Sequence, residues 1–181
     1  ENVVLKRVGK PPKFDFKPKD HVELGKMWDL IDIKRAAKVS GSRFYYFKNE
    51  AALLEFALVS YIFETLIPEG FVPVIPPVMI REKPYRGMGR LAPGDEEERY
   101  YIPKDELYLI GSAEHTLGPM HMNEILREEE LPKRYLGFSS CFRREAGSYG
   151  KDVRGIFRVH QFDKVEMFVF ASPKQSKVGR A

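Results

Sequence analysis

A long apolar stretch from Asn49 to Ile67, closed by Pro68, constrains the fold of this chain more than any other segment. Asn49 is placed to cap a helix, Glu50 lies in its first turn, and Pro68 cannot continue it. The apolar residues recur at helical spacing and form a broad face; they are Leu53, Leu54, Ala57, Leu58, Tyr61, Ile62 and Leu66. A helix this apolar must be buried on more than one side, and a subunit interface is one way to bury it.

The segment after this helix, from Phe71 to Ile80, is expected to be extended. It contains three prolines, each of which removes a backbone donor, so it fits the edge of a sheet or an interface better than the centre of a sheet. Residues 81–105 are loop-like, with several glycines and prolines. The acidic run at 95–98 within them is interpreted as a solvated loop.

Shorter patterns account for the rest of the chain. Residues 1–20 are polar and rich in Lys and Pro, which predicts an extended lead-in. Hydrophobic periodicity predicts the remaining elements: two short helices within 22–39, a strand over 43–48, a strand at 107–110, a helix over 116–130 ended by Pro132, strands at 135–143 and 154–162 joined by a turn at 147–150, and a strand at 165–170. Helices followed by several antiparallel strands predict an α+β fold with an antiparallel sheet backed by helices.

Composition excludes several classes of protein. The single Cys141 excludes an internal disulfide and a multi-cysteine zinc site, and is compatible with a reducing cytosol. It alternates with apolar neighbours and is expected to be a core residue. Four histidines lack the spacing of a metal site and are expected to be structural; they are His21, His115, His121 and His160. A net charge of +4 permits an anionic partner without demanding one. No apolar run is long enough to cross a membrane, and the first residues do not resemble a signal peptide.

Charged side chains fall inside the strands expected at 135–143 and 154–162, where burial is costly unless they are paired. Arg143 and Glu145 are two residues apart and therefore share one sheet face. The candidates for the same face on the returning strand are Arg158, His160, Phe162 and Glu166. Such a face suits a nucleotide: guanidinium pairs with phosphate, carboxylate accepts from an exocyclic amine, and phenyl stacks on a purine. Surface salt bridges on a solvated sheet remain the alternative that the pattern alone leaves open.

Two strings carry a resemblance to a known family. Phe-Arg-Arg-Glu-Ala-Gly-Ser-Tyr-Gly at 142–150 and Arg-Gly-Ile-Phe-Arg-Val-His-Gln-Phe-Asp-Lys-Val-Glu at 154–166 resemble motif 2 of the seryl-tRNA synthetases, which are class II aminoacyl-tRNA synthetases. Residues 50–80 resemble motif 1, with Pro77 as its signature proline, and in the family this motif builds the dimer interface. Further counterparts cover nearly the whole chain, at 11–16, 21–25, 36–45 and 87–91.

The resemblance implies an incomplete class II synthetase fold, an antiparallel β-sheet flanked by helices. We expect one partial catalytic domain over 1–181, divided into a lead-in with short helices at 1–48, the motif 1 helix and strand at 49–80, and the serine-binding segment with the motif 2 sheet at 107–170. Family members also carry an N-terminal coiled-coil arm and a motif 3, and neither pattern is found here. The start without a methionine suggests processing or excision from a longer protein, and we expect this fragment to be weakly active or inactive.

The activity implied by the resemblance is that of a serine–tRNA ligase, which activates L-serine with ATP to seryl-adenylate and transfers serine to tRNA(Ser). It implies a cytoplasmic homodimer with no membrane partner. It also implies Mg²⁺ as a cofactor, with ligands mainly in the part of the family that lies beyond this chain, so that no metal ligand is expected within the chain itself.

The resemblance assigns catalytic roles to Arg143, Glu145 and Arg158. Arg143 would grip the ATP α-phosphate and the serine carboxylate, Glu145 would accept from the adenine amino group, and Arg158 would contact the phosphates. The implied ATP site also includes Arg144, at a position that is commonly Ser in the family, the backbone of Val159, and Phe162 stacked on adenine.

Serine recognition is assigned by the same resemblance to Ser112, Ala113, Glu114, Arg143 and Glu166. Ser112 stands where the family usually has Thr, and it keeps the hydroxyl. A buried carboxylate that meets the substrate's ammonium and hydroxyl would reject analogues that leave it unpaired. From the residues alone, an acid at a helix N-terminus, near His115 and Thr116, is the favoured interpretation of Glu114.

Two other readings stay open. One is a synthetase-like binding or regulatory protein without catalysis. The other is an arm-less relative that loads amino acids onto carrier proteins, which uses a zinc site with cysteine ligands; a single cysteine argues against it.

Overall fold

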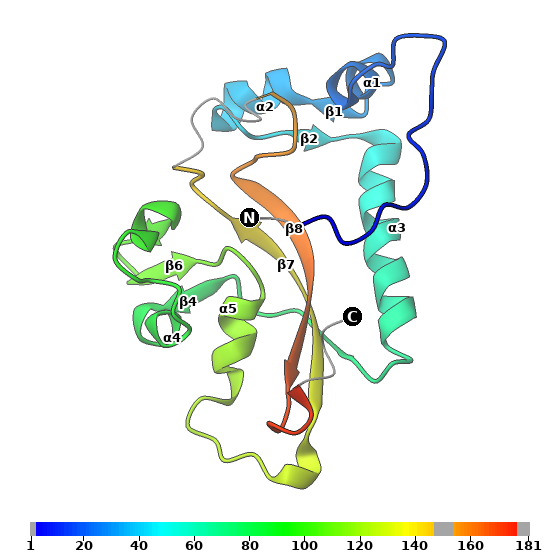
Figure 1. Ribbon diagram of the computed structural model, residues 1–181. Helices are drawn as coiled ribbons and strands as arrows, with labels where there is room; N and C mark the ends of the chain where they lie inside the picture. Colours follow the sequence, from blue (N-terminus) through cyan, green and yellow to red (C-terminus); the bar gives the residue numbers. More distant parts are fainter. Residues whose placement is uncertain (1–2, 147–153, 177–181) are drawn as a thin grey trace.

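The computed structural model describes residues 3–146 and 154–176. In chain order its helices and strands are α1 (His21–Met27), β1 (Ile31–Asp32), α2 (Ile33–Ser40), β2 (Tyr46–Phe47), α3 (Asn49–Leu66), β3 (Val72–Val74), β4 (Met79–Arg81), α4 (Glu82–Gly87), β5 (Tyr101–Ile102), β6 (Leu107–Leu109), α5 (Glu114–Leu117), β7 (Lys133–Phe142) and β8 (Gln161–Phe170). Three 3₁₀ turns are η1 (Asp95–Glu98), η2 (Gly118–His121) and η3 (Glu128–Glu130). The arrangement is α+β, as predicted (Figure 1).

The long β7 and β8 strands form the centre of the molecule. They pair antiparallel over their whole length, from Lys133 opposite Phe170 to Phe142 opposite Gln161. β3 joins the other edge of β7, in parallel, with Val72 opposite Tyr135. The proline-rich segment is therefore an edge strand, as predicted, but its parallel pairing differs from the purely antiparallel sheet that was expected. Parallel pairing follows because β3 and β7 are joined by a long crossover rather than a hairpin.

A second, smaller sheet lies beside the first, in the order β4-β6-β5 and antiparallel throughout. Behind it a compact apolar cluster is formed by Ile80, Tyr85, Leu91 and Ile110. The Ile110 amide donates to the Val78 carbonyl at 3.0 Å, and the Phe142 amide donates to the Ile110 carbonyl at 2.8 Å. These two bonds attach the small sheet to the end of β7, which is where charged side chains gather.

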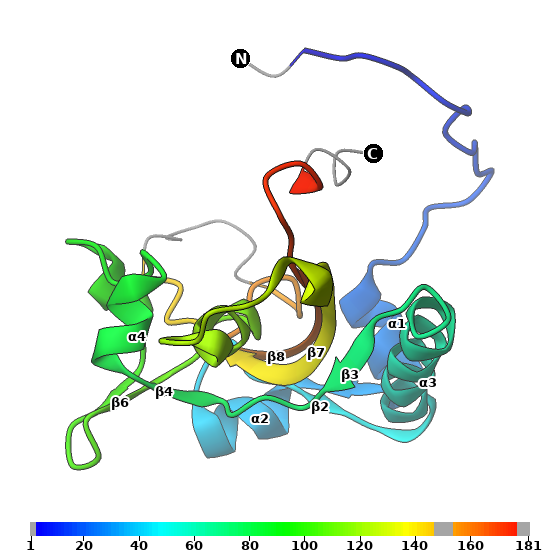
Figure 2. The same ribbon diagram turned by 90° about the horizontal axis from the view of Figure 1, so that it is seen from below.

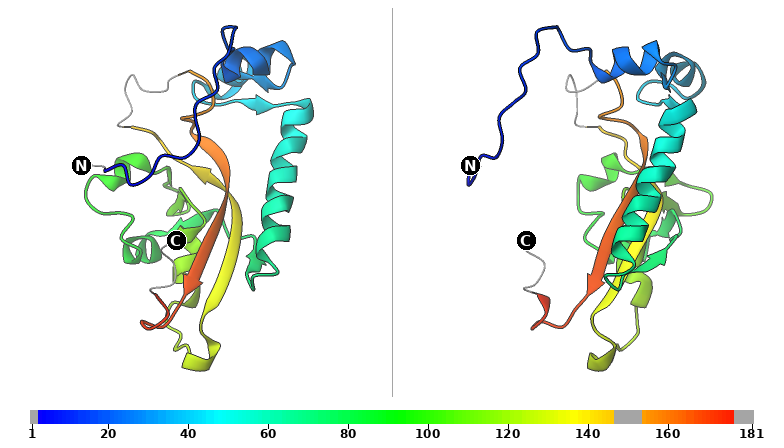
Figure 3. Two further views of the ribbon diagram at one scale, coloured as in Figure 1. Left: turned by 45° about the vertical axis from the view of Figure 1, so that its right-hand side comes forward. Right: turned by 90° about the vertical axis from the view of Figure 1, so that its right-hand side faces the viewer.

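α3 confirms the predicted helix, although its first turn differs. The N-cap is Lys48 rather than Asn49, and the Asn49 side-chain amide instead donates to the Asp29 carbonyl at 3.1 Å. None of the α3 residues is buried, and Leu53 and Tyr61 are about two-thirds exposed. Burial on more than one side is therefore not achieved within this chain. α3 and the β4–β6 sheet lie on opposite sides of the β7–β8 pair (Figure 2), and α3 runs beside that pair along most of its length (Figure 3).

Three sequence-based predictions of elements are wrong. The helix expected over 116–130 ends at Leu117, because Pro119 lacks a donor and the chain continues as the turns η2 and η3. The strands expected at 154–162 and 165–170 are one strand, β8, and residues 154–160 precede it. Gly155, with φ of 96°, interrupts extended backbone there. Residues 81–105 contain α4, η1 and β5 rather than loop alone. The turn expected at 147–150 lies outside the described residues.

Several other expectations are met. Residues 3–20 form an extended lead-in that leaves the body of the molecule (Figure 2). The two short helices within 22–39 correspond to α1 and α2. Cys141 is fully buried. Over the described ranges, every helix is too short or too polar to reach from one side of a lipid bilayer to the other.

The packing of α5 on β7 depends on Gly137, which has no side chain. A Cβ atom at Gly137 would lie 2.7 Å from Leu117 Cδ1 and 3.1 Å from Ala113 Cβ. Ala113 and Leu117 are both buried. Glycine therefore lets α5 approach the strand closely, and this contact sets the position of the residues that precede and begin α5.

Candidate active site

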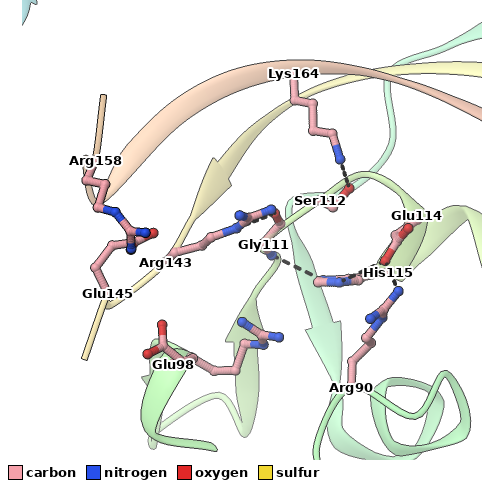
Figure 4. Close-up of a pocket in the computed structure, with 11 residues that line it drawn as sticks. Arg90, Glu98, Gly111, Ser112, Glu114, His115, Arg143, Glu145, Arg158 and Lys164 are labelled. Carbon is pink, nitrogen blue, oxygen red and sulfur yellow. Dashed lines mark hydrogen bonds and ion pairs between the residues drawn. The ribbon is translucent and has the colours of Figure 1, made fainter. Parts of the chain in front are cut away.

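A polar cavity of about 440 Å³ lies where the end of β7, the start of α5 and the loop after α4 meet (Figure 4). Nine of its eleven lining residues are ionisable, with five Arg or Lys against three Glu, so the cavity favours an anionic ligand. The lining consists of Arg90, Glu98, Arg99, Gly111, Ser112, Glu114, His115, Arg143, Glu145, Arg158 and Lys164.

Arg143 stands at the centre of this cavity, directly after the last residue of β7. Its Nε and Nη2 atoms donate to the Gly111 carbonyl at 3.3 and 3.2 Å. Its guanidinium carbon lies 5.1 Å from the centre of the Phe162 ring, a cation–π distance. Two anchors therefore hold the guanidinium in place before any ligand arrives.

Glu145 and Arg158 meet on the neighbouring side of the cavity, beyond the paired strands. Arg158 Nη1 lies 3.1 Å from Glu145 Oε2. The residues next to the end of the β7–β8 ladder, Arg143 and His160, are also hydrogen-bonded to each other. The Arg143 amide donates to the His160 carbonyl, and His160 Nδ1 donates to the Arg143 carbonyl, both at 3.0 Å. Glu145 has φ of 52°, in the left-handed region, so it leaves the strand direction there.

A smaller cavity of about 300 Å³ adjoins the first and shares Arg143 and Glu145 with it. Phe162 and Val159 contribute to its wall, and Val159 is buried. The structure thus brings five of the sequence-predicted residues to the walls of two cavities that share Arg143 and Glu145: Arg143, Glu145, Arg158, Val159 and Phe162.

Arg144 is placed differently. Its amide donates to the Glu98 carbonyl at 3.1 Å, and its guanidinium carbon lies 5.9 Å from the centre of the Tyr100 ring. It is absent from the linings of both cavities. The structure therefore directs Arg144 to Tyr100 and does not bring it to the predicted ATP-site residues.

Ser112 and Glu166 form a second predicted group, joined by Lys164. The Ser112 hydroxyl donates to Glu166 Oε2 at 2.5 Å, Lys164 Nζ donates to Ser112 Oγ at 2.9 Å, and Lys164 is ion-paired with Glu166 Oε2. Burial alone would raise the pKa of Glu166. The hydrogen bonds from Lys164 and Ser112, with the charges of Lys164 and Arg143, outweigh burial and leave that pKa below its ordinary value. Glu166 is therefore held as a carboxylate.

Glu114 begins α5 and forms an ion pair with Arg90, whose Nη2 lies 2.5 Å from Glu114 Oε1. The neighbouring His115 accepts from the Gly111 amide through Nδ1 at 3.1 Å, so its proton is on Nε2, which lies 3.6 Å from Glu114 Oε1. The pKa of His115 is lowered to about 3, first by burial and then by the charges of Arg99, Arg90, Arg143 and Lys164. His115 is consequently a neutral group near neutral pH.

The other predicted residues lie behind or outside the cavity. Ala113 is fully buried next to Gly137, where its side chain packs against β7 and offers no polar group to a ligand. Pro77 is exposed between β3 and β4, apart from the cavity lining.

The described part of this site offers no metal site built from protein ligands alone. Within residues 3–146 and 154–176, no group of three or more His, Cys, Asp or Glu side chains could hold an ion. Two of the cavity's carboxylates, Glu114 and Glu145, are already paired with arginines. Guanidinium and ammonium groups are not ligands for Mg²⁺, which prefers oxygen donors.

Sequence reasoning missed six residues that line the main cavity: Arg90, Glu98, Arg99, Gly111, His115 and Lys164. Lys164 could have been found, because it lies two residues before Glu166 on one strand and so shares its face. Arg90, Glu98 and Arg99 lie in a segment without periodicity, which offered no signal.

Comparison with known proteins agrees with this geometry. Residues 98–178 match the family described as "tRNA synthetase class II core domain (G, H, P, S and T)". The chain is 56% identical over 170 residues to the serine–tRNA ligase of Acidothermus cellulolyticus, covering 94% of this chain and 40% of that protein. It is 52% identical over 174 residues to the corresponding ligase of Thermobifida fusca, covering 96% of this chain and 41% of that protein.

Solved structures show the same likeness. The seryl-tRNA synthetase of Pyrococcus horikoshii, complexed with ATP, aligns with a TM-score of 0.86 and 48% identity, over 91% of this chain and 37% of that one. The cytoplasmic serine–tRNA ligase of Naegleria fowleri, in complex with AMP, aligns with a TM-score of 0.89 and 33% identity, over 97% of this chain and 42% of that one. The chain thus spans about 40% of the length of its curated relatives. Motif, sequence identity and fold agree, and the chain belongs to the seryl-tRNA synthetase family of class II aminoacyl-tRNA synthetases.

Proposed function

We propose that this chain is the part of a serine–tRNA ligase that binds ATP and serine, within a single catalytic domain. One observation carries the proposal: the cavity around Arg143 and Glu145 adjoins the hydrogen-bonded group of Ser112 and Glu166. A nucleotide site and a site for a hydroxylated amino acid thus share one arginine. The ATP and AMP complexes of two similar synthetases support the nucleotide half.

In the nucleotide half, Arg143 would neutralise the α-phosphate and Arg158 the other phosphates, since guanidinium matches phosphate oxygens. Glu145 would accept from the adenine amino group. Phe162 would stack on the base, and Val159 would line it through its backbone. Arg144 would contribute only through a rearrangement away from Tyr100, because its guanidinium lies over that ring.

In the amino-acid half, Glu114 would bind the ammonium of serine and Glu166 its hydroxyl, with Ser112 beside them. Arg143 would hold the serine carboxylate next to the α-phosphate. In this structure the Glu114 carboxylate is ion-paired with Arg90. The ammonium of serine would replace the Arg90 guanidinium as its partner. A substrate without a hydroxyl would leave Glu166 unsatisfied, which is how polar sites reject analogues.

The reaction that follows is an in-line displacement. A serine carboxylate oxygen bonds to the α-phosphorus, the bond from that phosphorus to the bridging oxygen breaks, and pyrophosphate leaves with the electron pair. A terminal hydroxyl of tRNA(Ser) then attacks the carbonyl carbon and AMP leaves. The residues contribute position and charge neutralisation rather than covalent chemistry. Magnesium remains a prediction, and no step is assigned to it.

The remaining partners belong to the same proposal. The exposed apolar side chains of α3, together with Pro77, would form a homodimer interface. The whole protein would act on tRNA(Ser) in the cytoplasm, without a membrane partner.

Calorimetric titration with non-hydrolysable aminoacyl-adenylate analogues tests this function. We expect the seryl analogue to bind more tightly than the alanyl and threonyl analogues. Equal affinity for all three would contradict the serine site, and no binding of any would contradict the adenylate site. Seryl preference together with absent pyrophosphate exchange in the whole protein would instead favour a non-catalytic binding protein.

A further inference from the structure

Lys164 contacts both Glu166, which is proposed to bind the substrate hydroxyl, and the neighbouring Ser112. It stands two residues before Glu166 on β8, so both side chains project from one face of the strand. Its Nζ donates to Ser112 Oγ at 2.9 Å and is ion-paired with Glu166 Oε2. Together with the Ser112–Glu166 bond, these contacts close a triangle of three polar atoms (Figure 4 shows the Lys164–Ser112 side).

This triangle determines the direction of each hydrogen bond. An ammonium can only donate, so Ser112 Oγ accepts from Lys164 and directs its own proton to Glu166. In the part of the chain that the structure describes, each contact of the Glu166 carboxylate is made through Oε2. Oε1 is consequently the oxygen left to accept a hydrogen bond from a ligand.

We infer that Lys164 is a positioning residue for serine recognition, which orients the Ser112 hydroxyl and the Glu166 carboxylate so that Glu166 Oε1 accepts from the hydroxyl of the bound amino acid. The inference rests on the proposed function and adds a specificity-determining residue to it. Lys164 would act through Glu166 and Ser112 rather than by touching the reacting atoms.

The charges around Glu166 support this role. Glu166 is not part of the cavity lining, but its partners Ser112 and Lys164 are. Arg143 at the end of β7, and Glu114 and His115 of α5, also line this cavity. Of these, the two cations lower the pKa of Glu166 against the effect of burial, and His115 is neutral near pH 7. Replacing Lys164 by an uncharged residue would let the pKa of Glu166 rise. Lys164 therefore favours the charged form of Glu166, which is the stronger acceptor for the substrate hydroxyl.

Lys164 has a second possible role, direct contact with an ATP phosphate, which an experiment must distinguish from the positioning of Glu166. Lys164 lines the cavity together with Arg143 and Arg158, so its ammonium could instead contact an ATP phosphate directly. The two roles predict different losses. A phosphate contact would weaken ATP and every aminoacyl-adenylate analogue alike, whereas a positioning residue would weaken the seryl analogue selectively.

The test compares Lys164→Met, which removes the charge and keeps the stem, with Lys164→Arg, which keeps both charge and donors. Affinities for ATP and for the seryl and alanyl adenylate analogues are measured by calorimetry. For Lys164→Met we expect the preference for the seryl over the alanyl analogue to fall about tenfold or more, with ATP affinity within about threefold of the parent. Lys164→Arg should restore most of the preference. An unchanged preference in Lys164→Met, or an equal loss for ATP and both analogues, would overturn the inference.

A second measurement is independent of ligand binding. Carbon NMR of the labelled Glu166 carboxyl, followed through an acid titration, should show a higher pKa in Lys164→Met than in the parent and little change in Lys164→Arg. If the parent protein bound no seryl analogue, the proposed function would fail while this titration still tested the Lys164–Glu166 pair. An unaltered Glu166 titration in a folded Lys164→Met protein would count against the inference even if serine binding were established.

Discussion

The guanidinium carbon of Arg143 lies 5.1 Å from the centre of the Phe162 ring. Phe162 is paired with Cys141 across the β7–β8 ladder, and Arg143 follows Cys141 by two residues. Diagonal neighbours of this kind share one sheet face and are within reach of long side chains. The ladder therefore places the proposed phosphate-binding group and the proposed adenine-stacking group side by side.

Arg143→Ala should remove the central cation of the site. We expect pyrophosphate exchange by the whole protein to fall on the order of a hundredfold or more, because one preorganised charge donor is lost. Arg127→Ala is the matched control, since Arg127 is exposed and its ion pair is with the nearby Glu130, away from the cavity lining. Exchange near the parent rate in Arg143→Ala would contradict the assignment.

Phe162→Ala should weaken nucleotide binding, since stacking of a base on an aromatic ring contributes about 1–3 kcal/mol. ATP affinity, measured by calorimetry, is expected to fall between about fivefold and a hundredfold. Phe162→Tyr keeps the ring and should retain most of the affinity. Equal affinities in the alanine and parent proteins would show that the base binds elsewhere.

Gly137→Val should disturb serine recognition from a distance. The added side chain would meet Leu117 and Ala113 and push α5 away from β7, at a cost of about 1–3 kcal/mol in unfolding free energy. We expect the seryl analogue to bind more weakly because Ser112 and Glu114 flank Ala113. Gly87→Ala serves as the control, since nothing lies within 4 Å of its added Cβ. Parent-like stability of Gly137→Val would mean that the approach of α5 is not limiting.

Acidification should destabilise the protein through His115. The pKa of His115 is about 3 in the folded protein against an ordinary value of 6.5. Between these values the unfolded chain binds the extra proton, so stability falls as the pH falls from about 6.5 towards 3. His115→Asn keeps an acceptor for the Gly111 amide but does not titrate. From urea unfolding, we expect the parent to lose about 1 to 2 kcal/mol more than this variant between pH 7 and pH 5. Parallel pH profiles would refute the assignment.

Self-association is expected to depend on the outer side of α3. Leu53 and Tyr61 are about two-thirds exposed on this helix. The double change Leu53→Lys and Tyr61→Glu should leave folding intact, because both residues are exposed, and should shift the protein from dimer to monomer in sedimentation experiments. The double change adds one positive and one negative charge and leaves the net charge unaltered. Glu64→Lys, an exposed position on the same helix, shows what a change of charge does when no apolar side chain is lost. A parent protein that is already monomeric would contradict the proposed interface.

The sequence predicted those features that follow from strong local periodicity. α3 was predicted because its apolar pattern persists over many turns and stops at Pro68. The grouping of Arg143, Glu145 and Phe162 was predicted from the period of two in strands together with the family resemblance. The residues do meet, but Arg143 and Glu145 follow the end of β7, and Glu145 has left-handed backbone, so a shared strand face is not what brings Glu145 there. Cys141 was predicted to be buried for the same reason, since it alternates with its neighbours in β7.

The failed predictions have tertiary causes. Asp163 and Lys164 fall between the two strands that were expected at 154–162 and 165–170. β8 continues through both residues, because Ser140 across the ladder donates to Asp163 at 2.6 Å and Lys164 donates to Ser112. Residues 116–130 have helical composition, but the chain makes only short turns there after Pro119. Arg90 reaches Glu114 from an irregular loop, and no local pattern foretells such a contact.

Ser112 follows the strand β6 of the small sheet, whereas Glu166 belongs to β8 of the large one. An amino acid that contacted both residues would bridge the two sheets. Its affinity would therefore depend on the position of one sheet relative to the other. A substitution that shifts one sheet relative to the other, even far from the site, would reduce selectivity between amino acids before it reduced affinity for the nucleotide.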